Sequence, residues 1–359
     1  MAYATFADLP PEMVGNVFAF IRSKPDQGSV CLISRALRDL MAPMMWEELE
    51  TDFRDVSTRQ LATLLHPESR ITSNVRKLDV GDSASSADGE DFVKMLLTAI
   101  PNDRLWTFAS SANITTLTFH MLLQSQRKLK LLDTFTYFTT PGLSKSTTLD
   151  SAEHHTWIGL SLTNISSMTL EIIPHQVSEK RIFRSIESIS KMCPRLEELL
   201  LTSHSLVQYK KTSLCAILGH AKEFPLFASL TILRLYGLRL IGPGHQAICK
   251  SLDLSKLCTL DVQGCDHHVL FMQGLSSYYA SGTGDLQDLC IALPLHLQGA
   301  QKTVESIEGL LKVCPKLRIL RLVLESHGLV DKDYIITHGQ SLHSLMIGTG
   351  SQHSVRIPH

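Results

Sequence analysis

Two short clusters in the sequence group residues that could bind a metal ion. Cys265 is followed by Asp266, His267 and His268, and a second cluster runs from Glu153 to His155. Structural zinc takes four ligands in tetrahedral geometry, usually supplied as two spaced pairs, and both clusters lack a second pair. The sequence therefore predicts no metal site and no cofactor.

Other patterns that support catalysis are also weak. The glycine turns GPG and SGTGD lack the strand-to-helix context and the lysine of a phosphate-binding loop, and no G-x-S-x-G motif occurs. Serine, histidine and aspartate are scattered, and nothing fixes three of them together. We therefore expect no enzyme, although an active site on a repeat scaffold stays open as an alternative.

Composition favours a globular protein. The 359 residues are 44% hydrophobic and 19% charged, with a net charge of −1, so no segment predicts binding to nucleic acid or to a membrane surface. No apolar run approaches the length of a transmembrane helix. The eight cysteines form no C-x-x-C pair and are typical of reduced thiols, so we expect a cytoplasmic or nuclear location.

Two segments more than a hundred residues apart resemble each other. SIESISKMCPRLEELLL begins at Ser185, and SIEGLLKVCPKLRILRL begins at Ser306. Each predicts a helix that ends at Cys-Pro, followed by a strand with the pattern L-x-x-L-x-L, which is the signature of leucine-rich repeats. The same signature predicts ten strands, whose patterns start at Val75, Leu105, Leu129, Ile165, Leu196, Leu230, Leu257, Leu286, Leu317 and Leu342. The spacing of about 30 residues is at the long end of the leucine-rich range.

Two details refine this repeat pattern. The segment from Ile114 to Leu122 also fits a strand, but its apolar spacing and the even spacing of the repeats favour a helix. Cys265 occupies the ninth position of its repeat, so it has a structural role there. We expect an α/β fold in which parallel strands line a concave face and helices lie outside.

Residues between the leucines of each repeat are expected on the concave face, where a partner protein could bind. The candidates for substrate binding are Glu171, Arg234, Tyr236, Asp261, Gln263 and Arg321. Each of them could equally be an ordinary solvated position of the sheet.

The first 50 residues predict a separate small helical unit. Pro10 and Pro11 suit the first turn of a helix, and Met13, Val17 and Ile21 follow on one helical face. A second helical pattern covers Val30 to Met41, with Asp26 as a candidate cap and Pro43 at its end. So small a core would gain from a partner.

This unit resembles the F-box. The resemblance rests on Leu9-Pro10-x-Glu12, Met13-Val14, Val17-Phe18, Ile21, LISRALRDL and MWEEL, and it covers about residues 6–50. It implies binding to a Skp-type adaptor and, through it, to the cullin of an SCF-type ubiquitin ligase. The adaptor-binding residues would be Leu9, Pro10, Glu12, Met13, Val14, Val17, Phe18, Ile21, Leu32, Leu37 and Trp46. An ordinary helical cap on a larger domain is the alternative.

Together the two patterns are similar to fungal-type F-box proteins with C-terminal leucine-rich repeats. In that family the repeats select the protein to be ubiquitinated. The expected organisation is a helical F-box domain at 1–50, a linker or connecting helix at 51–74, repeats at 75–350 and a short tail at 351–359. A repeat scaffold that never meets the ligase is the alternative.

Overall fold

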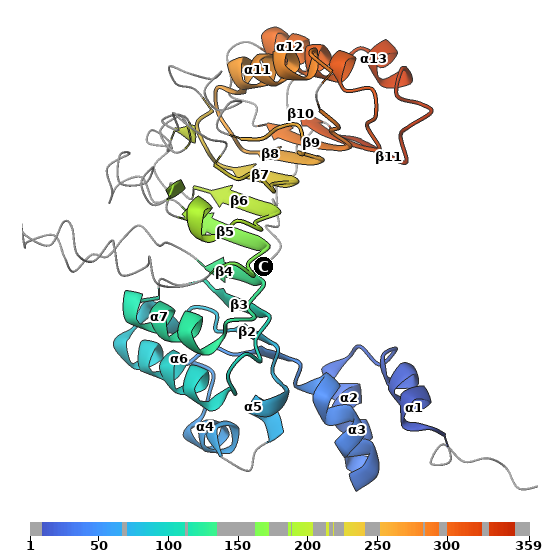
Figure 1. Cartoon of the computed structure of the whole chain (residues 1–359). Coiled ribbons are helices and arrows are strands. Elements are labelled where there is room, and N and C mark those ends of the chain that lie inside the picture. The colour runs from blue at the N-terminus through green and yellow to red at the C-terminus, as the bar shows by residue number, and fades with distance from the viewer. Residues whose placement is uncertain are drawn as a thin grey trace, which may run out of the picture. The chain divides into compact units, whose positions relative to one another are not determined.

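The computed structural model describes residues 9–66, 70–111, 114–134, 162–171, 186–187, 189–203, 213–214, 218, 226–240, 252–282, 284–293, 300–324 and 330–348. The fold is α/β, with parallel strands and helices, as expected. The chain divides into two compact units, Met1–Phe135 and Thr136–His359. Figure 1 labels the elements of each unit.

Three helices begin the first unit: α1 (Pro11–Phe18), α2 (Lys24–Ile33) and α3 (Arg35–Met45). The single helical pattern expected over residues 30–41 is wrong, because Ser34 is extended and separates α2 from α3. The Ser34 side chain accepts a hydrogen bond from the Leu37 backbone N–H and so caps α3. Two smaller predictions also fail, since Pro43 lies inside α3 and Asp26 lies within the first turn of α2, after the N-cap residue Ser23.

The segment expected as a linker is packed against the rest of the first unit. It contains α4 (Thr58–Leu65) and α5 (Arg70–Asn74), and strand β1 (Glu48–Glu50) directly precedes it. The Thr51 N–H donates to the Asp79 carbonyl oxygen at 2.9 Å, and the rings of Phe53 and Phe92 lie 5.8 Å apart. Residues 51–74 therefore form connecting helices rather than an extended linker.

The remaining elements of the first unit are β2 (Lys77–Asp79), the 3-10 helix η2 (Ser83–Ser85), α6 (Ala87–Ala99), β3 (Thr107–Ser110), α7 (Thr116–Ser125) and β4 (Leu131–Thr134). Strands β1 to β4 pair in parallel and in chain order. Phe92 and Leu96 of α6 are buried, as are Leu78 and Phe108 of the strands. Figure 1 shows α6 and α7 beside these strands, and α7 confirms the helix expected after Ile114.

The second unit contains β5 (Ser167–Glu171), β6 (Glu198–Thr202), β7 (Ile232–Tyr236), β8 (Thr259–Gln263), β9 (Asp288–Leu293), β10 (Ile319–Leu324) and β11 (Ser344–Gly348). These strands also pair in parallel and in chain order. Among the described residues of this unit are the helices α11 (His268–Tyr279), α12 (Ala300–Val313) and α13 (Lys332–Ile336), of which α11 and α12 pack together (Figure 1).

The strand register confirms the repeat spacing read from the sequence. Each strand from β2 to β11 begins two residues after a predicted start. A row of buried leucines, paired from strand to strand, runs from Leu199 through Leu233, Leu260 and Leu289 to Leu320. Leu199 and Leu320 therefore occupy equivalent core positions, as the similarity of their segments indicated.

Candidate functional site

The first candidate surface lies on the three N-terminal helices. Val14, Phe18 and Met41 form their buried core, and Leu9, Ile21 and Leu37 are among the apolar residues packed against it. Val14 and Phe18 were expected on the adaptor-binding surface, and this part of the prediction is corrected. They face inward because the side of α1 that carries them packs against Met41 of α3.

The other residues assigned to adaptor binding differ in the exposure of their side chains. Pro10, Glu12, Met13, Val17 and Leu32 are exposed, and Trp46 is half-buried. Five large apolar side chains of these helices are exposed, and we name them the exposed apolar set: Met13, Val17, Phe20, Leu32 and Ile33. Where such side chains adjoin, as Leu32 and Ile33 do in the chain, they are normally an interaction site or an aggregation hazard.

Phe20 and Ile33 were not among the residues predicted from the sequence for adaptor binding. Phe20 follows the end of α1, off the helical stripe, and is 85% exposed. Ile33 falls within the single helical pattern predicted over residues 30–41, but it ends α2 and is 71% exposed, beside Leu32 at 88%. The polar Ser34 that follows Ile33 is the only sequence signal that could have indicated the break.

The second candidate surface follows strands β6 to β10 of the second unit. Asp261 is its centre: its Oδ2 accepts a hydrogen bond from the Tyr236 hydroxyl at 2.9 Å, and Gln263 Nε2 lies 3.0 Å from each carboxylate oxygen. Cys290 lies directly opposite Asp261 on β9. The structure therefore brings together three of the residues predicted for substrate binding in one hydrogen-bonded cluster.

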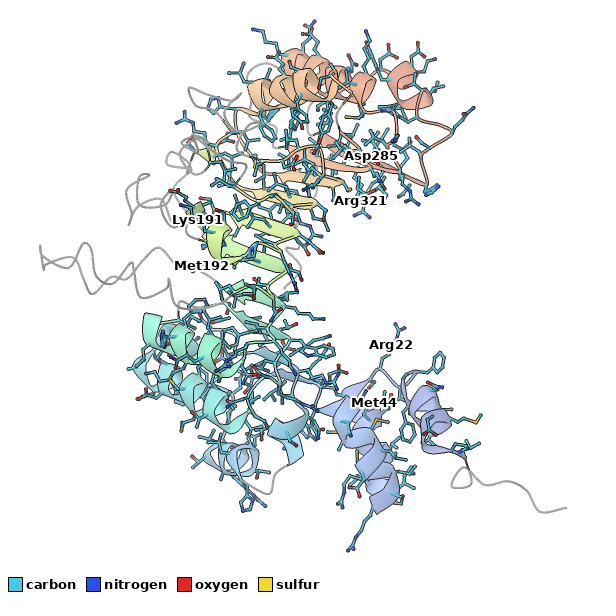
Figure 2. The ribbon with its side chains drawn as sticks, viewed as in Figure 1. Arg22, Met44, Lys191, Met192, Asp285 and Arg321 are labelled. Carbon is cyan, nitrogen blue, oxygen red and sulfur yellow. The ribbon has the colours of Figure 1, made fainter. Side chains whose placement is uncertain are left out.

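The remaining predicted residues of this surface are more separate. Arg234 Nη1 pairs with Glu198 Oε1 at 2.6 Å across β6 and β7. Arg321, labelled in Figure 2, lies on β10 in register with Cys290, and its side chain is exposed. Glu171 is the last residue of β5, and its side chain lies outside the described residues.

Two side chains near Asp261, those of Cys290 and Tyr236, have raised pKa values. Burial, followed by the nearby Asp261 charge, raises the pKa of Cys290 to about 12 and also raises the pKa of Tyr236. Both groups are therefore protonated at neutral pH, and the Tyr236 hydroxyl donates to the carboxylate. A thiol in this state is a poor nucleophile, so the geometry suits binding better than covalent catalysis.

The clusters considered for metal binding show local structural roles. Cys265 is buried, and its Sγ donates to the Leu235 carbonyl oxygen at 3.3 Å, which confirms its role in the repeat. His268 is buried at the start of α11, with Nε2 2.9 Å from Thr303 Oγ1, and burial lowers its pKa. Within the described residues, no three histidine, cysteine or acidic side chains gather as a metal site. The cluster Glu153–His155 lies outside them.

Comparison with known proteins yields no match to a family model or to a curated protein. In the described part of the chain, no helix combines the length and the apolar character needed to cross a membrane.

Proposed function

We propose that this protein is the substrate-recognition subunit of an SCF-type ubiquitin ligase. Its N-terminal helices would be an F-box that binds a Skp-type adaptor, and through it a cullin. Its parallel strands would be a leucine-rich-repeat solenoid that binds the target protein. In this role the protein needs no catalytic residue and no cofactor, and it acts in the cytoplasm, the nucleus or both.

The exposed apolar set is the observation that carries the proposal. The helical core has three buried residues, yet Phe20, Leu32 and Ile33 of the same small unit are mostly exposed. Burying an apolar side chain of this size contributes about 1.5–3 kcal/mol, so several together support a stable interface. The F-box resemblance of residues 6–50 supports a Skp-type adaptor as the protein that covers them.

The polar surface on β6 to β10 supports target binding. Tyrosine and arginine are common binding anchors, and this surface offers both on a rigid sheet. Because Tyr236 is tied to Asp261, whereas Arg321 is exposed, Arg321 is the stronger candidate for contact with a target.

Co-expression tests the proposal. The intact chain is produced together with a Skp-type adaptor and a cullin, and the purified complex is analysed. We expect both to co-purify with the wild type and to be lost from Leu32→Asp, since a buried charge without a partner costs several kcal/mol. Ile336→Asp, a matched change of an exposed residue of α13, should retain them.

A folded wild type that captures no adaptor would favour the alternative function, a repeat scaffold with no ligase role. A complex that survives Leu32→Asp would show that the adaptor binds elsewhere.

A further inference from the structure

A row of one aromatic and two basic side chains lies on the first unit. Arg76, Trp106 and Lys130 each directly precede a strand (β2, β3 and β4). The Trp106 N–H donates to the Arg76 carbonyl at 2.7 Å, and the Lys130 N–H donates to the Trp106 carbonyl at 2.9 Å. The backbone therefore fixes the three residues side by side.

The two cations lie against the indole of Trp106. Arg76 Cζ is 4.6 Å and Lys130 Nζ is 5.3 Å from the ring centroid, both within the range of cation–π attraction. The indole is nevertheless 41% exposed. The row therefore presents an accessible aromatic ring with two positioned positive charges less than 10 Å apart.

These charges lack a carboxylate partner. Lys77, the next residue along β2, forms an ion pair with Glu48. Within the described part of the chain, Arg76 and Lys130 form no ion pair, although other charged residues of the first unit do. Their positive charge is thus available to an anionic partner.

The surrounding residues limit the size of that partner. Asp79 and Asp133 lie three positions beyond Arg76 and Lys130, so the positive charge does not continue along the strands beyond this row, whereas Arg104 and Lys128, two residues before Trp106 and Lys130, extend it on the other side. A nucleic-acid backbone carries a charge at every nucleotide and needs a longer basic surface. Carboxylates two residues apart in an extended peptide project to the same side, about 7 Å apart, which is compatible with two cations less than 10 Å apart.

We propose that Arg76, Trp106 and Lys130 form a binding site for a short acidic peptide segment of a partner protein. Two carboxylates of the segment pair with Arg76 and Lys130, and the peptide backbone between them lies over the exposed edge of Trp106. This site is independent of the adaptor and of the polar surface on β6 to β10.

Fluorescence anisotropy with a labelled peptide of alternating glutamate and leucine tests the site on the intact chain. We expect saturable binding that weakens with added salt, and no comparable binding of the matched glutamine–leucine peptide. Trp106→Ala should weaken binding about tenfold or more, and Arg76→Ala or Lys130→Ala about three- to tenfold. Lys94→Ala, which removes an equal charge from α6, should stay within about twofold.

Two controls separate a loss of binding from a loss of folding: the conservative variant Trp106→Phe, and the urea midpoint of each variant. The phenyl ring should retain most of the binding, and a variant is compared only if its urea midpoint matches that of the wild type. Equal binding of the two peptides, or unchanged binding by folded Trp106→Ala, overturns the proposal. Tighter binding of a ten-nucleotide oligouridylate than of the acidic peptide also overturns it, in favour of a nucleic-acid site. Because no adaptor is present, these outcomes are separate from those of the co-expression test.

Discussion

The N-terminal helices and the strands of the second unit use the same apolar residue types in different ways. From β6 to β10, the leucines of the paired row are fully buried because each strand covers its neighbours. On the helices, Phe18 is buried, while Phe20, two residues later, is mostly exposed. Strands β6 to β10 bury the leucines of this row, whereas the helices keep several large apolar side chains exposed.

Phe18 and Phe20 give the largest expected difference. Phe18→Ala should cost about 3–5 kcal/mol, enough to unfold so small a helical core, whereas Phe20→Ala should change stability by less than about 0.5 kcal/mol. Limited proteolysis and circular dichroism of the intact chain report the loss of the helices. Similar behaviour of the two variants would mean that the helices are not packed as described.

The comparison can be repeated within the repeats. Leu345 of β11 is paired in register with Leu320, but it is 48% exposed. Leu320→Ala should cost about 2–5 kcal/mol and Leu345→Ala less than about 1 kcal/mol, measured by urea denaturation. Equal losses would show that β11 is covered to the same extent as the inner strands.

A buried histidine makes the stability of the second unit depend on pH. His338 is buried after α13, its Nε2 donates to the Leu311 carbonyl oxygen at 3.1 Å, and burial lowers its pKa. The unfolded chain therefore binds the proton more readily, so the stabilising effect is complete above about pH 6.5 and is lost as the pH falls. The loss should approach at most about 1.4 kcal/mol per pH unit. In urea melts from pH 7.5 to 5, His338→Gln should show a smaller pH dependence, and an unchanged one would exclude this histidine as the cause.

The polar face of the sheet should show the smallest effect. Tyr236→Phe removes one hydrogen bond to Asp261 and should cost about 0.5–1.5 kcal/mol. Arg321→Ala, at an exposed position of the same surface, should change stability by less than about 0.5 kcal/mol. Urea midpoints measure both, and a larger loss for Arg321→Ala would mean that this arginine is part of the scaffold.

The repeat strands could be predicted because their pattern reflects burial directly. Leucine or another large apolar residue at the inward positions of β5 to β10 is a strong signal, and even the weak pattern at Leu342 marked β11 correctly. Strand β1 was missed because Glu48–Glu50 carries one apolar residue and directly follows the helices. The pairing of β1 with β2, which is not encoded locally, makes it a strand.

The candidate sites were harder to predict than the scaffold. The sequence predicted an apolar helix from Pro10 to Ile21 but could not divide its residues into buried and exposed, because that depends on how the neighbouring helices pack against it. Arg76, Trp106 and Lys130 were also missed, since they are about 30 and 24 residues apart and become neighbours only through strand pairing.

Titration calorimetry of a purified Skp-type adaptor into the intact chain tests the central claim most directly. If the exposed apolar set is the adaptor site, the wild type should bind with micromolar or tighter affinity and a negative heat-capacity change. Leu32→Ala should weaken binding at least about tenfold, and Ile336→Ala should match the wild type. A folded wild type that gives no binding heat across several temperatures, or equal affinities for the two variants, would contradict the account.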